Sequence, residues 1–272
     1  MKRYKLLWLT GLFLWFCSSC GNFLSEYSQN LSYIETASDL EELLLGSGYQ
    51  EPINIIVPGP QLATLAKKKD FMSYIHLLDD DVKEAPAPPS TDKPWQEMSG
   101  YYRWADDPNV TISQTSISDP VWPDFYERIA VLNAIIGQIP EQRKKNKSED
   151  EILNQVGGET YFLRAWYYFM LVNIYGAPYE KSNPDALWGV PLKSEEVIDI
   201  YYSRNTVGKV YESVIRDLEM AISLFKNVSR ITTKQHATID ACYALLSRVY
   251  LYMEKYEECI QMANQLEGKG YG

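Results

Sequence analysis

Histidine and cysteine are scarce in this chain of 272 residues, and their scarcity limits the chemistry that the protein can perform. The two histidines, His76 and His236, stand far apart, and neither has a cysteine, a serine or a carboxylate pair at motif spacing. A catalytic triad or a zinc site needs such a grouping. Gly157-Gly158 lacks the strand context of a dinucleotide-binding loop, and the sequence has no Walker motif. We therefore expect no enzyme, no cofactor and no metal.

Basic residues are also fewer than acidic residues. Lys and Arg number 26 against 36 Asp and Glu, which gives a formal net charge of -10 and a pI near 4.8. The basic residues cluster only at 67–69 and 143–145, so we expect no nucleic-acid partner, because phosphate binding needs a basic patch. The acidic run Asp79-Asp80-Asp81 is interpreted as a solvated segment rather than a calcium loop, since no further oxygen ligands follow at loop spacing.

No apolar run is long enough to cross a membrane as a permanent helix. The longest run, residues 6–16, has eleven residues where a span needs about 20, and it follows three positive residues near the N-terminus. Residues 1–19 therefore predict a signal peptide. Its end, Phe16-Cys17-Ser18-Ser19-Cys20, resembles the lipobox of bacterial lipoproteins, which predicts acylation of Cys20 and a lipidated tether over 20–35. The alternative is plain secretion, with Cys20 as an ordinary thiol.

Hydrophobic periodicity changes along the rest of the chain. Residues 36–45 predict a short helix that begins at Thr36 or Ser38 and ends at Gly46. Residues 82–120 are rich in proline, then in aromatic residues, and predict an irregular aromatic loop. A helical period begins at Pro120 and indicates an all-α domain. The predicted helices cover 120–137, ending at Gly137 and Pro140, then 148–175, 206–225, 236–253 and 256–266, with a weaker candidate at 61–70.

The last two predicted helices carry a repeat signal. Residues 244–267 resemble a tetratricopeptide unit, in which Tyr250 closes the first helix and small residues open the second. Cys259 stands where such units commonly have alanine, because two helix backbones cross there. This favours a free thiol at Cys259 over a disulfide with Cys242, although both remain open. The second helix should be partly uncovered, because repeat arrays normally end in a capping element.

Several segments together resemble the N-terminal half of the SusD/RagB family. They are the lipobox, DLEELLLG at 39–46, WPDFYERIAVLNAIIGQI at 122–139, GETYFLRAWYYFMLVNIYGAPY at 158–179, WGVPL at 188–192, RNTVGKVYESVIRDLEMAISLF at 204–225 and ATIDACYALLSRVYLYMEKYEECI at 237–260. The resemblance implies an all-α fold of tetratricopeptide-like helical hairpins with long irregular loops, over 36–272. It also implies helical repeats over 120–267, preceded by the aromatic loop of 82–120.

The same resemblance implies a function and partners. Members are outer-membrane lipoproteins that bind glycans or other nutrients and act with a SusC-like TonB-dependent transporter. We therefore expect nutrient binding, a transporter partner and a lipid anchor on the outer membrane, facing the cell surface. Members continue beyond the last hairpin, whereas this sequence ends at Gly272. The alternative is a truncated helical-repeat adapter or remnant that docks a partner without binding glycan.

A glycan site is expected in the aromatic loop. Sugar recognition combines flat aromatic faces, which cover the apolar face of a pyranose, with polar groups that bond its hydroxyls. Residues 95–109, WQEMSGYYRWADDPN, have this composition. The candidate ligand-binding residues are Trp95, Tyr101, Tyr102, Trp104, Asp107 and Asn109. The alternative is that these aromatic side chains pack on the helices.

Overall fold

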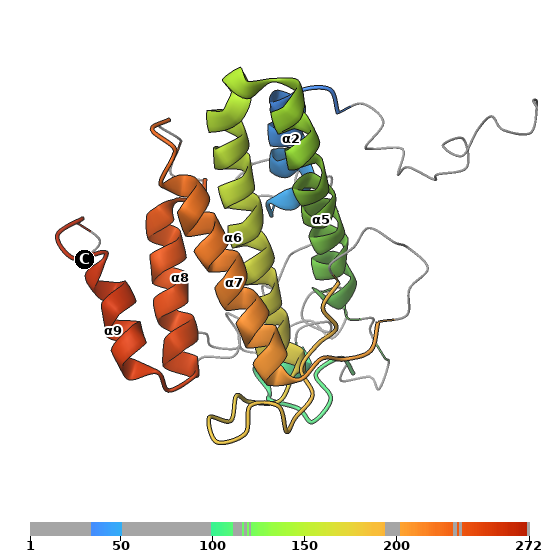
Figure 1. The fold of residues 1–272 in the computed structure, drawn as a ribbon. Coiled ribbons are helices and arrows are strands. Elements are labelled where there is room, and N and C mark those ends of the chain that lie inside the picture. The colour runs from blue at the N-terminus through green and yellow to red at the C-terminus, as the bar shows by residue number, and fades with distance from the viewer. Residues whose placement is uncertain are drawn as a thin grey trace, which may run out of the picture. The chain divides into compact units, whose positions relative to one another are not determined.

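Long helices run side by side through the body of the protein (Figure 1). The computed structural model describes residues 34–50, 99–110, 116, 119, 121–193, 202–230, 233 and 236–270. Within these residues there is no named strand, and the only sheet-like pairings are two isolated bridges. The all-α prediction is confirmed. The signal peptide, Cys20, the candidate helix at 61–70, the acidic run 79–81 and Trp95 lie outside the described residues.

Helix α5 (Val121–Lys145) begins where the sequence predicts and ends later. The Asp119 side chain accepts a hydrogen bond from the Val121 amide (2.9 Å), as an N-terminal cap should. The predicted end at Gly137 and Pro140 is wrong, because the helix continues through both to Lys145. Packing against α6 outweighs the local cost of these residues, and Arg143 ties the last turn to Asp150 (3.2 Å).

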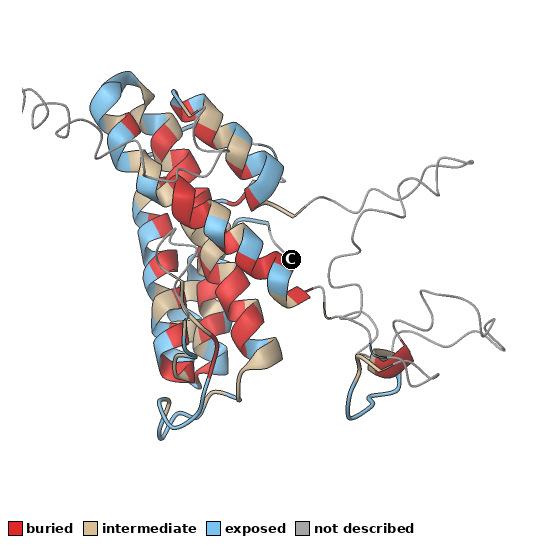
Figure 2. Ribbon diagram, turned by 90° about the vertical axis from the view of Figure 1, so that its right-hand side faces the viewer, coloured by how far each residue is buried: buried red, intermediate tan, exposed pale blue. Residues whose placement is uncertain are grey.

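Helix α6 (Asp150–Tyr175) follows the short 3-10 turn η4 (Lys147–Glu149) and is the central element. It packs on α5 and α7 and also touches α2 and α8, which explains why its apolar residues surround most of its circumference. Figure 2 shows buried residues along the inward faces of the helices. Gly157 and Gly158 lie where α6 meets the end of α7. A Cβ atom added to Gly158 would stand 2.7 Å from the Phe225 ring, so these glycines permit close helix packing.

Helix α7 (Val207–Phe225) leads into a hairpin of α8 (Ile239–Tyr252) and α9 (Tyr256–Asn264). Thr206 and Thr238 cap α7 and α8 by accepting backbone hydrogen bonds. The predicted hairpin is present, with free thiols at Cys242 and Cys259. Burial raises the pKa of Cys242 to about 12. As expected, α9 is uncovered: none of its residues is buried, and Ile260 is 59% exposed.

Helix α2 (Ala37–Leu43) and the π-helical turn η2 (Leu44–Gly48) pack against α5 and α6. Thr36 is the N-cap, and its exchange of hydrogen bonds with Asp39 forms a capping box. The predicted end at Gly46 is wrong, since the helix changes to π geometry at Leu44 and ends at Gly48. A Cβ atom added to Gly48 would stand 2.7 Å from Leu44 Cδ1 and 3.2 Å from Leu132 Cδ2, so close packing favours glycine at this boundary.

Candidate functional site

The aromatic segment forms a tight turn over residues 99–110. Residues 99–102 are helical, which the sequence did not predict. The Tyr101 hydroxyl donates to Asn109 Oδ1 (2.8 Å), and the Asn109 amide donates to Asp107 Oδ1 (3.0 Å). Gly100 sits against the Pro108 carbonyl, where an added Cβ would come within 2.3 Å of the oxygen. The turn is therefore closed by hydrogen bonds and by a position that only glycine can fill.

This turn exposes Trp104. Its indole is 71% exposed, and its backbone has φ 52°, a left-handed conformation that is uncommon for a bulky residue. Apolar side chains of this size are normally buried, so both the strained backbone and the exposed indole are energetically unfavourable at this position. Such costs are frequent at binding sites. Trp104 is thus the most exposed aromatic side chain among the described candidate residues.

The other candidate residues divide into two groups. Tyr101 and Asn109 bond to each other and build the turn, whereas Asp107 is exposed and Tyr102 is half-buried. Burial raises the pKa of Tyr101, and the negative charges of Asp119 and Asp107 raise it further. The structure therefore brings Tyr101, Tyr102, Trp104, Asp107 and Asn109 into one turn.

A second cluster of aromatic side chains lies where α5 begins and α6 ends. Trp122 packs edge-on against Tyr175 (ring centroids 5.0 Å), whose hydroxyl bonds Asp119. The Arg204 guanidinium lies 5.5 Å from the Trp122 ring centroid and donates to the carbonyls of Tyr175 (2.9 Å) and Gly189 (2.8 Å). Asp119 thus links the aromatic turn electrostatically to this end of the bundle.

A second exposed indole, Trp188, lies in the chain between α6 and α7 and is 64% exposed. Backbone hydrogen bonds fix its position. The Trp188 carbonyl accepts from the Ala177 amide (3.2 Å), the Leu187 carbonyl accepts from the Val207 amide, and the Gly189 amide donates to the Asn205 carbonyl. The residues before α7 therefore present Trp188 rigidly. The sequence motif WGVPL indicated the family but not this exposure.

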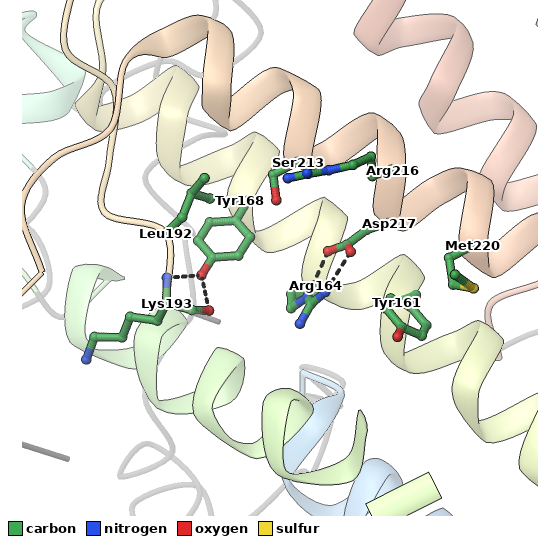
Figure 3. A pocket seen from close by; sticks show the side chains of 9 residues that line it. All are labelled: Tyr161, Arg164, Tyr168, Leu192, Lys193, Ser213, Arg216, Asp217 and Met220. Atoms are coloured by element: carbon green, nitrogen blue, oxygen red, sulfur yellow. Dashed lines mark hydrogen bonds and ion pairs between the residues drawn. The ribbon is translucent and has the colours of Figure 1, made fainter. Parts of the chain in front are cut away.

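A buried ion pair joins α6 to α7 (Figure 3). Arg164 holds Asp217 through two parallel hydrogen bonds of 2.7 Å and donates a third to Asn133 on α5 (2.8 Å). Burial raises the pKa of Asp217, and the hydrogen bonds and charge of Arg164 oppose that shift. Desolvation lowers the pKa of Arg164, but Asp217 outweighs it and leaves the net shift upward. The bidentate geometry supports an ionised pair.

The same network holds the chain that follows α6. Asn133 donates to the Lys193 carbonyl (2.9 Å), and the Tyr168 hydroxyl exchanges hydrogen bonds with the Lys193 carbonyl (2.9 Å) and amide (2.8 Å). Burial raises the pKa of Tyr168 well above its ordinary value, which keeps this hydroxyl protonated. Three helices and one connecting segment thus meet at a single polar cluster.

A further polar cluster centres on buried Glu159. Its carboxylate accepts from Tyr49 and Gln155 and contacts His236 Nδ1 (3.0 and 3.1 Å). The Tyr49 hydroxyl in turn accepts from the Ala237 amide (2.8 Å), and burial beside Glu159 raises the pKa of Tyr49. The cluster ties the chain after η2 and the chain before α8 to α6. No sequence signal indicated it, because 110 and 77 residues separate Glu159 from Tyr49 and His236.

Neither metal binding nor a membrane span is found in the part of the chain that the structure describes. No group of three His, Cys, Asp or Glu residues there could hold a metal ion. No described helix is both long and apolar enough to cross a bilayer.

Comparison with known structures shows the fold. A SusD superfamily protein of Bacteroides thetaiotaomicron matches 87% of this chain and 47% of its own length, with 23% identity and a TM-score of 0.60. A SusD superfamily protein of Bacteroides vulgatus matches 85% and 46%, with 22% identity and a TM-score of 0.62. A SusD-like carbohydrate-binding protein of Bacteroides vulgatus matches 87% and 46%, with 18% identity and a TM-score of 0.60. The chain spans about half the length of each.

Comparison of the sequence gives the family. A search among proteins of curated function finds no match. The model of a SusD-like family, described as starch-binding and associating with the outer membrane, matches residues 73–251, which are more than half of the chain. The matched range contains the aromatic turn and helices α5 to α7. The resemblance seen in the sequence motifs is thereby confirmed, and this chain belongs to the SusD-like family.

Proposed function

We propose that this protein binds glycans at the outer membrane through the aromatic turn of residues 99–110. The exposure of Trp104 on a turn held by internal hydrogen bonds carries the proposal. An indole so presented offers a flat apolar face to a sugar ring, and Asp107 beside it offers a carboxylate to hydroxyl groups. Tyr102 completes the described part of the site, and Trp95 is proposed as a further contact from the preceding chain.

The closure of the turn also supports this function. The hydrogen bond from Tyr101 to Asn109 and the close approach of Gly100 to Pro108 hold the turn in one shape, so Trp104 and Asp107 stay exposed. The proposed role is capture of a sugar chain rather than its cleavage.

Membrane attachment and a transporter partner complete the proposal. A lipid on Cys20 would hold the protein at the outer membrane, facing the cell surface, and the family description supports association with that membrane. A SusC-like TonB-dependent transporter would take the captured nutrient onward. Radiolabelled palmitate incorporation tests the lipid. Incorporation should occur in the unaltered chain and disappear in Cys20→Ala, and its persistence in that variant would reject Cys20 as the attachment site.

Glycan binding is tested with two matched tryptophan variants. The purified chain is titrated with a panel of soluble glycans by calorimetry, in a detergent without a sugar headgroup. Trp104→Ala should weaken binding roughly 5- to 100-fold, if stacking of a sugar ring on the indole is worth about as much as the roughly 1–3 kcal/mol of a base stacked on an aromatic side chain. Trp188→Ala removes an indole of similar exposure and serves as the control. Equal affinity of Trp104→Ala and the unaltered chain would refute the proposed site.

A helical-repeat adapter is the second candidate function, and the open face of the last hairpin favours it. Leu251, Tyr252, Tyr256 and Ile260 are each about half exposed or more on α8 and α9. Such a face suits a protein partner better than a sugar chain. If the adapter role is correct, the purified chain binds no glycan in the panel but co-purifies with the transporter, and Ile260→Asp abolishes that association. Glycan binding lost in Trp104→Ala would favour the first function.

A further inference from the structure

A small pocket of about 270 Å³ opens between α6 and α7, and no residue of the aromatic turn lines it (Figure 3). Tyr161, Arg164 and Tyr168 of α6 form one side, and Ser213, Arg216 and Asp217 of α7 form the other. Its volume is slightly below the range of roughly 300–1,000 Å³ that drug-sized ligands occupy, so it suits a single small molecule.

The charges that face this pocket do not cancel. Arg164 and Asp217 neutralise each other through their bidentate pair. Lys193 contributes mainly backbone, because its ammonium lies over the rings of Tyr126 and Tyr202 and points away from the pocket in Figure 3. Arg216 is exposed and forms no ion pair with any residue that the structure describes. One positive charge therefore remains uncompensated.

The hydrogen-bond donors of the pocket also favour a negatively charged ligand. Figure 3 shows the Arg216 guanidinium lying back along α7 toward Ser213, which adds a hydroxyl donor. Among the described residues, Arg164 donates three of its five N–H groups to Asp217 and Asn133. Guanidinium groups present their donors in a fork that matches a carboxylate. The pocket wall thus combines the guanidinium fork of Arg216 with the hydroxyl of Ser213.

We propose that this pocket binds the carboxylate of a small organic acid, with Arg216 as the principal contact. Tyr161 and Met220 flank the charged groups and offer an apolar wall to a ring-shaped ligand. The acidic character of the protein does not oppose this binding, because charges more than about 8 Å away are largely screened at physiological salt. A sugar acid and a simple carboxylate share the chemistry that Arg216 recognises. The proposal does not depend on the aromatic turn.

Calorimetric titration of the purified chain with glucuronate, glucose and acetate tests the pocket. Glucuronate should bind, glucose should not, and Arg216→Gln should weaken glucuronate binding roughly 10-fold, as expected for loss of one charge-assisted contact. Binding of acetate as tight as that of glucuronate would also support the site and identify the carboxylate alone as the recognised group. No binding of either anion, or equal binding of glucose, would overturn the proposal.

Two control variants make the result specific. Arg248→Gln removes an exposed arginine from α8, outside the pocket, and should bind glucuronate as the unaltered chain does. Equal weakening by Arg248→Gln would show a general charge effect and overturn the site. Trp104→Ala should leave glucuronate binding unchanged, so failure of the glycan proposal and failure of this one are distinguishable. Arg216 is exposed, and an unchanged melting temperature will show that Arg216→Gln remains folded.

Discussion

Removal of the Asp217 carboxylate should destabilise the protein more than removal of any exposed acid on the same helix. Asp217 is 7% exposed and Arg164 is 15% exposed, so both charged groups are largely out of water. Truncation to alanine leaves the Arg164 guanidinium without its bidentate acceptor, so that among the described residues it keeps the hydrogen bond to Asn133 alone. The variant therefore contains an uncompensated buried charge between α6 and α7.

The burial of the two charged groups sets the expected loss of folding stability in Asp217→Ala. Breaking a buried ion pair by deleting one partner costs roughly 3–5 kcal/mol. The partial exposure of Arg164 allows water to reach the group, so we expect the lower end, about 3 kcal/mol. For a domain of this size, each kcal/mol lowers the melting temperature by about 2–4 °C, which gives a decrease of ~6–12 °C.

Urea denaturation followed by circular dichroism measures this loss. Glu219→Ala is the matched control, because it removes an exposed acid two residues further along α7 and should cost under about 0.5 kcal/mol. The paired variant Arg164→Met with Asp217→Leu should be more stable than Asp217→Ala, since it buries no charge. A loss below about 1 kcal/mol for Asp217→Ala would refute the reasoning.

Further predictions concern glycines and thiols. Gly158→Ala should destabilise the protein by about 1 kcal/mol, because crowding against Phe225 exceeds the gain in helix propensity. Gly137→Ala should stabilise the protein by about 0.5–1 kcal/mol, because no atom lies within 4 Å of its added Cβ. Urea denaturation measures both changes, and a change of the same sign in both variants would contradict the packing argument. Iodoacetamide at pH 8 should modify Cys259 in the folded protein and leave buried Cys242 unmodified, as mass spectrometry of peptides will show, and rapid labelling of Cys242 would contradict its burial. Because burial raises the pKa of Cys242 from 9.0 to about 12, its thiol ionises first in the unfolded chain, so stability should decrease as pH rises from about 9 to 12. Cys242→Ala should reduce that slope, and an unchanged slope would exclude the thiol as a contributor.

Sequence patterns located the helices well but placed several of their ends poorly. Thr36, Thr206 and Thr238 occupy N-cap positions, and an N-cap acts through hydrogen bonds to residues two or three positions away. Such local signals are visible in sequence. The ends at Gly46 and Gly137 were misplaced, because packing of η2 and α5 against neighbouring helices overrode the local preference of glycine.

The candidate site was likewise predicted only in part from the sequence. Composition alone predicted an aromatic segment around Trp104, since sugar recognition requires particular residue types. It did not predict which of those residues would be exposed. The hydrogen bond from Tyr101 to Asn109 and the contact of Gly100 with Pro108 make that choice, and both depend on how the turn closes.

The sequence by itself determined the fold class, the family and the order of the helices, because these follow from periodicity and from motifs along the chain. Tertiary structure alone decided that Glu159 meets Tyr49 and His236, and that Arg164 meets Asp217. It also decided that Arg216 faces a pocket without an ion-pair partner among the described residues. Contacts between residues separated by 50 to 110 positions arise only when helices pack, and no local pattern specifies which polar groups then share a buried space.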